Sequence, residues 1–166
     1  MINHILDKAQ AQIEQGRLWR AKEILQGAIR SESYDIQLFE IMGVVLLKMG
    51  DLPEAGKFLF LSGVRRPEYQ ESIEIFLGKH QRRQPRDFLY LLPRKARLRN
   101  VSDYPDQVAQ VLRQMGFPEV LKNKDGKVYI PEAGNDRVIW ITCGTIAVIT
   151  VVLIILGLIK LREIIR

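Results

Sequence analysis

Apolar residues recur at helical spacing from Ile2 to about position 79, and this pattern predicts a series of amphipathic α-helices. The stripes follow i, i+3, i+4 and i+7 spacing, which places each set on one face of a helix. The first stripe is Ile2, Ile5, Leu6, Ala9 and Ile13, and the second is Leu18, Ala21, Leu25, Ala28 and Ile29. The third is Ile36, Phe39, Met42, Gly43 and Leu46, and the fourth is Ala55, Phe58, Leu59 and Ser62. Pro67 is expected to stop the fourth helix, and a fifth, capping helix is expected over about 71–79, with Ile73, Phe76 and Leu77.

The first two pairs of helices are related by an internal repeat. GRLWRAKEIL at 16–25 returns as GDLPEAGKFL at 50–59, which is a 34-residue offset. Gly16 and Gly50 occupy equivalent positions and are expected to end the preceding helices in the left-handed conformation. Pro53 suits the first turn of the fourth helix, where its missing N–H is not needed.

The second unit carries eight residues in the register of a known 34-residue helix–turn–helix motif: Phe39, Gly43, Leu46, Gly50, Ala55, Leu59, Ser62 and Pro67. It therefore resembles a tetratricopeptide repeat (TPR), whereas the first unit resembles that repeat only in its second half. Residues 1–78 also look similar to a small bacterial family of unknown function that is TPR-like and often membrane-linked. These resemblances imply an all-α fold, a short TPR-like α-solenoid of helix-turn-helix repeats.

The resemblance also implies a peptide-binding groove, since TPR-like proteins line a concave surface with the first helix of each unit. The corresponding positions are Asn3, Leu6, Gln10 and Ile13, then Gln37, Glu40, Val44 and Leu47. TPRs that clamp a C-terminal carboxylate place Lys and Asn there, and their absence here disfavours such a clamp. The apolar strip of Leu6, Ile13, Val44 and Leu47 favours an apolar peptide with a basic flank. The alternative is that residues after 80 fold back and fill the groove.

A second, very different apolar pattern lies near the end of the chain. Residues 138–159 contain no charged residue, and fourteen of them are Val, Ile or Leu. A helix of this length spans roughly 33 Å, close to the hydrocarbon thickness of a bilayer. The pattern predicts a single C-terminal transmembrane helix, preceded by a polar linker at 131–137 and followed by a short basic tail at 160–166.

Between these parts, residues 79–100 carry eight Lys or Arg and one acid, Asp87. FLYLL, residues 88–92, is expected to form a short turn of helix. One interpretation is that FLYLL docks onto the end of the solenoid and the arginines form a solvated rim. The other is contact with an anionic lipid surface. Nucleic acid is disfavoured because no known nucleic-acid motif appears. The anionic-surface candidates are Arg82, Arg83, Arg86, Arg94, Lys95, Arg97 and Arg99.

Further along, a helix is expected from Ser102 through Met115, ended by Gly116, and a hairpin is expected around 123–126. The predicted organisation is helical repeats with a capping helix at 1–79, a basic segment and juxtamembrane linker at 80–137, the span at 138–159 and the tail at 160–166.

Charge and composition refine this picture. The net charge is +6, and the excess lies after residue 78, next to the predicted span. The one cysteine, Cys143, lies within the span, so disulfides are not expected. No apolar run opens the chain, which predicts a cytoplasmic N-terminal domain. His4 and His80 lack metal-ligand spacing, and no catalytic or nucleotide motif is present, so neither an enzyme nor a cofactor is expected.

The leading functional prediction is therefore a tail-anchored membrane protein that presents a TPR-like interaction domain to a protein or peptide partner in the cytoplasm. The alternatives are a peripheral binder of anionic lipid or nucleic acid through residues 79–99, and a membrane component of a defence or immunity system.

Overall fold

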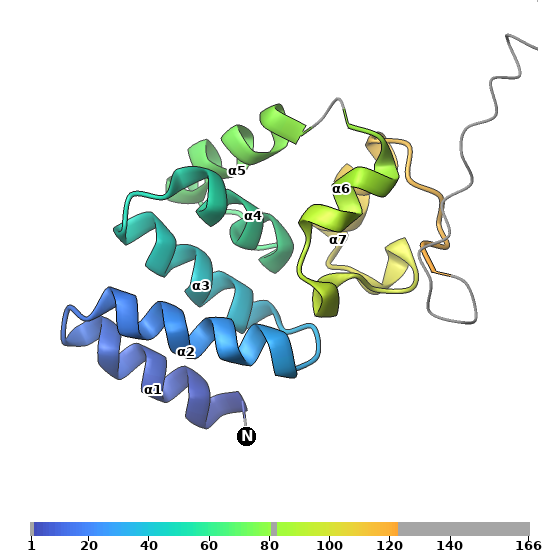
Figure 1. Cartoon of the computed structure of the whole chain (residues 1–166). Coiled ribbons are helices and arrows are strands. Elements are labelled where there is room, and N and C mark those ends of the chain that lie inside the picture. The colour runs from blue at the N-terminus through green and yellow to red at the C-terminus, as the bar shows by residue number, and fades with distance from the viewer. Residues whose placement is uncertain (1, 81–82, 123–166) are drawn as a thin grey trace, which may run out of the picture. The chain divides into compact units, whose positions relative to one another are not determined.

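The computed structural model describes residues 2–80 and 83–122, and within these residues the chain is all-α, without a β-strand (Figure 1). The first five helices are α1 (Ile2–Glu14), α2 (Leu18–Ser31), α3 (Ile36–Lys48), α4 (Leu52–Ser62) and α5 (Pro67–His80). They are followed by α6 (Pro85–Leu91), the 3₁₀ turns η1 (Arg94–Ala96) and η2 (Val101–Asp103), and α7 (Asp106–Gln114). The all-α class predicted from the hydrophobic stripes is confirmed.

The structure reproduces the 34-residue period of the sequence. The bounds of α3 are those of α1 moved by one period, and α4 likewise begins one period after the start of α2. Equivalent side chains are equally buried: Ala21 and Ala55 are both 0 % exposed. The glycines that end α1 and α3 have the expected positive φ, 71° at Gly16 and 80° at Gly50. The first four helices are therefore consistent with a helical repeat of two helix–turn–helix pairs.

Two predicted helix boundaries are wrong. Gly63, with φ of 72°, ends α4, and Pro67 begins α5 instead of stopping α4, so α5 starts four residues before the predicted 71. The helix expected from Ser102 begins only at Asp106, directly after Pro105. Proline restricts the residue before it to extended backbone and suits the start of a helix. Pro67 is the first residue of α5, and Pro105 is the N-cap residue of α7.

The packing of α4 against α5 depends on a glycine in the middle of α4. A Cβ atom added to Gly56 would lie 1.9 Å from the backbone oxygen of Ser72 and 2.9 Å from Cβ of Phe76. These two helices therefore meet backbone to backbone, closer than any residue with a side chain would permit.

Aromatic side chains join the repeat helices to the residues that follow position 80. The Phe88 ring of α6 lies 6.1 Å from Phe60 on α4, 5.7 Å from Phe76 on α5 and 5.8 Å from Phe117, measured between ring centroids. Phe88 and Leu89 are buried, and Leu92 is 1 % exposed. FLYLL thus docks onto the repeat helices, as the first part of one interpretation expected. This packing does not test whether the arginines form a solvated rim or contact an anionic lipid surface. Side chains on both sides of residue 80, where the composition changes, share one hydrophobic cluster.

The predicted span 138–159, the linker 131–137, the hairpin 123–126 and the tail 160–166 all lie outside the described residues. None of the helices within 2–80 and 83–122 is both long enough and apolar enough to cross a bilayer.

Candidate functional site

Five of the eight positions predicted for the peptide groove surround one depression between α1 and α3, referred to below as the α1–α3 groove. It has a volume of about 730 Å³. Its lining comprises Asn3, Leu6, Asp7 and Gln10 from α1, with Gln37, Glu40 and Ile41 from α3. Asp7 and Ile41 had not been predicted, although each directly follows a predicted position on its helix. Among the described residues, none after position 80 lines this groove.

The carboxylate of Glu40 is held in place by the first turn of α5. Its Oε1 accepts a hydrogen bond of 3.0 Å from the Tyr69 hydroxyl and pairs with Nη2 of Arg66 at 2.9 Å. Burial, together with the hydrogen bond to Glu40, raises the pKa of Tyr69 to about 12, so this hydroxyl keeps its proton at neutral pH. Glu40 therefore has a fixed orientation, which a flexible surface glutamate would lack.

The other three predicted groove positions have a different environment. Ile13, Val44 and Leu47 are half-buried and pack against the hydrophobic core, and they are not part of the groove lining. Of the predicted apolar strip, Leu6 is the member that lines the groove, and its side chain is mostly buried, with 8 % exposed. The groove surface consists mainly of amides and carboxylates.

A larger cavity, of about 1000 Å³, lies between the C-terminal half of α2 and the segment after α6. We call it the basic cavity because six cationic side chains line it: Arg30, Arg94, Lys95, Arg97, Arg99 and Lys122. Four of them belong to the predicted anionic-surface set. The remaining wall is formed by Gln26, Ile29, Ser33, Tyr34, Phe58, Pro93 and Leu98.

The other members of the predicted anionic-surface set lie elsewhere. Arg83 and Arg86 are exposed and do not line the basic cavity, and Arg82 falls outside the described residues. The structure therefore divides the basic segment into a group that gathers around a cavity and a group that does not. Arg30 and Lys122 were missed by the sequence analysis because each is isolated from the basic segment along the chain.

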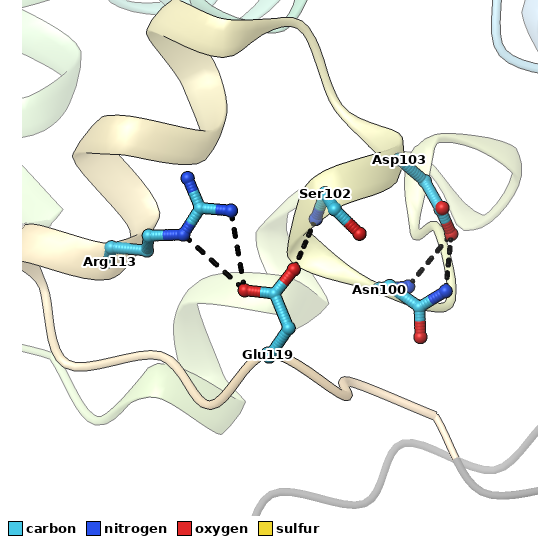
Figure 2. A network of polar contacts seen from close by, with 5 residues as sticks. All are labelled: Asn100, Ser102, Asp103, Arg113 and Glu119. Atoms are coloured by element: carbon cyan, nitrogen blue, oxygen red, sulfur yellow. Dashed lines mark hydrogen bonds and ion pairs between the residues drawn. The ribbon is translucent and has the colours of Figure 1, made fainter.

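Figure 2 shows a polar network of Asn100, Ser102, Asp103, Arg113 and Glu119, residues that lie between Arg99 and Lys122 in the chain. Glu119 accepts a 2.8 Å hydrogen bond from the Ser102 backbone N–H and is contacted by Nε and Nη2 of Arg113 at 3.4 and 3.3 Å. The Asp103 carboxylate accepts hydrogen bonds of 3.0 Å from the backbone and side chain of Asn100. These contacts hold two chain segments together, and the Arg99 carbonyl accepts from the Lys122 backbone N–H at 3.2 Å.

The backbone around η1 is also fixed from within. The Tyr104 hydroxyl donates to the Ala96 carbonyl at 2.8 Å and accepts from the Leu98 N–H at 2.9 Å. Burial raises the pKa of Tyr104 to about 12, so it remains a donor at neutral pH. The Arg97 side chain donates to the carbonyls of Leu92 and Tyr90 at 3.0 and 3.1 Å. The loop that carries four of the six cations is therefore ordered by its own hydrogen bonds.

Within 2–80 and 83–122, no three His, Cys, Asp or Glu side chains gather closely enough to hold a metal ion. His80 packs against Phe76, with 5.2 Å between ring centroids. Burial is the main cause that lowers the pKa of His80, and the positive charges of Arg83 and Lys79 lower it further. His4 is exposed on α1.

Comparison with known proteins gives a family match for residues 1–163, and that family is described as Family of unknown function (DUF6584). No curated protein and no solved structure matches the chain.

Proposed function

Because the chain belongs to the family of unknown function DUF6584, we propose its role from geometry: a TPR-like interaction domain that binds a peptide in the α1–α3 groove beside a membrane. The observation that carries the proposal is the groove itself. It brings together five positions at which TPR-like proteins contact their ligands, and these positions come from two different helices. The 34-residue offset between α1 and α3 supports the TPR-like assignment.

The lining indicates the kind of peptide. Asp7 and Glu40 are acidic, Asn3, Gln10 and Gln37 are amides, and no cation is found among the described lining residues. Glu40 is already paired with Arg66, which leaves Asp7 to attract a cationic group. Leu6 and Ile41 offer apolar contact, and amides donate and accept hydrogen bonds along a peptide backbone. The chemistry suits a peptide with a basic residue next to an apolar one.

Peptide display on the full-length chain in a mild detergent tests this proposal. Selected peptides should be enriched in a Lys or Arg adjacent to an apolar side chain, and Asp7→Lys should reduce their binding about tenfold or more, because it places a cation opposite the peptide's own. The matched control is Glu71→Lys, an exposed position on α5 with the same change in charge. Equal binding to both variants would show that the groove is not the site.

The membrane part of the proposal is supported by the uncharged sequence 138–159. The full-length chain should resist alkaline extraction from membranes, whereas a variant with Leu153→Arg and Ile154→Arg should be released, because two charges at the centre of the segment oppose insertion by several kcal/mol. Protease added from the cytoplasmic side should digest the N-terminal domain. Digestion from the opposite side would reverse the proposed orientation.

A further inference from the structure

The charge of the basic cavity is unbalanced. Six cations line it, and no carboxylate is found among its lining within the described residues. None of the six forms an ion pair with a carboxylate in residues 2–80 and 83–122. Desolvation, with repulsion from Arg97 and Arg94, lowers the pKa of Lys122. Like charges held this close oppose folding, and an anion in the cavity would remove that cost.

The cavity is built before any ligand arrives. The Tyr104 hydroxyl fixes the backbone at Ala96 and Leu98, and the network around Glu119 fixes Arg99 beside Lys122. On the opposite wall, Tyr34 donates its hydroxyl to the Leu61 carbonyl, and its ring packs edge-on against Tyr104 with 5.6 Å between centroids. Because both walls are ordered, an anion would bind without the entropic cost of arranging a flexible loop.

We propose that the basic cavity is a binding site for a small ligand that carries two or more phosphoryl groups. Four of the six cations are arginines. Arg97 already donates to two backbone carbonyls and contributes its charge, whereas the planar guanidinium groups of Arg30, Arg94 and Arg99 can match phosphate oxygens in pairs. A single negative charge would leave most of the cationic charge uncompensated, so a polyanion fits better. The volume of about 1000 Å³ is that of a small-molecule site. Ile29, Phe58 and Leu98 supply an apolar wall for the carbon skeleton of such a ligand.

This site is separate from the α1–α3 groove and shares no lining residue with it. It also differs from a flat anionic-surface contact, because Arg30 and Lys122 take part while Arg83 and Arg86 do not. A cavity site and a flat surface contact can therefore be distinguished by two variants that each remove two positive charges, one inside the cavity and one outside it.

Calorimetric titration with inorganic tripolyphosphate, on the full-length chain in phosphatidylcholine nanodiscs, tests the proposal. The cavity pair, Arg30→Gln with Lys122→Gln, should weaken binding at least about tenfold, since it removes two charge-assisted contacts. The control pair, Arg83→Gln with Arg86→Gln, removes the same charge outside the cavity and should change binding less than about twofold. Circular dichroism confirms folding, and Arg94→Gln with Lys95→Gln replaces the cavity pair if that pair unfolds.

A second arm identifies the source of the phosphate. In nanodiscs containing cardiolipin, whose headgroup carries two phosphates, a lipid ligand would compete and lower the apparent affinity for tripolyphosphate in the wild type but not in the cavity pair. Unchanged affinity would assign the site to a soluble phosphorylated molecule. Equal losses in both pairs would show a diffuse electrostatic attraction, and absence of tripolyphosphate binding at low salt would show that no such site exists. Either result overturns the proposal.

Discussion

Replacing Gly56 by alanine should destabilise the fold by forcing α4 and α5 apart. The added Cβ would lie 1.9 Å from the Ser72 oxygen, 2.6 Å from the Ser72 carbonyl carbon and 2.9 Å from Cβ of Phe76, whereas ordinary contacts begin near 3.4 Å. Two of the three obstacles are backbone atoms, which cannot rotate away. One helix must therefore shift by more than 1 Å, as the 1.9 Å and 3.4 Å distances require.

The size of the effect follows from two opposing terms. Overpacking of a buried contact costs about 1–3 kcal/mol, and occasionally more. Alanine has a better helix propensity than glycine by roughly 1 kcal/mol, which offsets part of that cost. The shift would also loosen the contact of Phe60 with Phe76, whose ring centroids are 6.0 Å apart. Loosening this aromatic pair adds about 0.5–1.5 kcal/mol to the loss, so we expect a net decrease of about 1–3 kcal/mol in the free energy of unfolding.

Urea unfolding of the full-length chain in a mild detergent, followed by circular dichroism, measures this change. Gly27→Ala is the matched control, because Gly27 lies within α2 and an added Cβ meets nothing within 4 Å. In this variant only the better helix propensity of alanine matters, so the free energy of unfolding should rise by up to about 1 kcal/mol. If Gly56→Ala also raised stability, the close approach of α4 and α5 would be refuted.

Four further substitutions test local interactions by the same unfolding measurement. Tyr104→Phe should lower the free energy of unfolding by about 1–3 kcal/mol, because the buried Ala96 carbonyl and the half-buried Leu98 N–H lose their hydroxyl partner. An unchanged free energy of unfolding would contradict these two hydrogen bonds. Asp35→Ala should cost about 1 kcal/mol, since Asp35 caps α3 through a 2.8 Å bond; Asp51→Ala, with a 3.3 Å bond at α4, should cost less. Desolvation acts to raise the pKa of Glu119, but hydrogen bonds from Ser102 and Arg113 outweigh it and lower that pKa. Glu119 therefore stabilises the fold fully above pH 4.5, the ordinary value, and this contribution disappears as the pH falls through the lower folded pKa. Glu119→Gln should reduce the fall in the free energy of unfolding between pH 4.5 and lower pH. An unchanged fall would contradict the hydrogen bonds that Glu119 accepts.

The helices of the repeat were predictable because local signals agreed with one another. The hydrophobic stripes, the 34-residue offset and the glycines at 16 and 50 all describe the same four helices. Pro67 was misjudged because proline both ends helices and begins them. The left-handed Gly63 shows which role applies here, since it already ends α4 four residues earlier.

The two candidate sites differ in how much the sequence could reveal. The predicted groove positions follow from helical spacing within the 34-residue repeat, and five of them line the α1–α3 groove. The basic cavity is lined by Arg30 and Lys122, which are distant from each other in the chain. Lys122 follows the isolated bridge between Asn100 and Val120 and the network around Glu119, and no local pattern encodes such long-range pairing. Counting basic residues located the segment but not the cavity.

The aromatic contacts of Phe88 restrict how this array of repeats could lengthen. Within the repeats, α2 packs on α3 at the junction between the two helix pairs that the 34-residue period relates, so a duplicated pair inserted there would lie between helices of the same repeat. After α5 the chain offers no such recurring face in the part that the structure describes, because Phe60 and Phe76 are covered by Phe88, with Phe117 behind it. Duplication there would expose these rings to water. The array is therefore closed at its C-terminal end, and engineered variants of greater length should be built from the junction between residues 31 and 36.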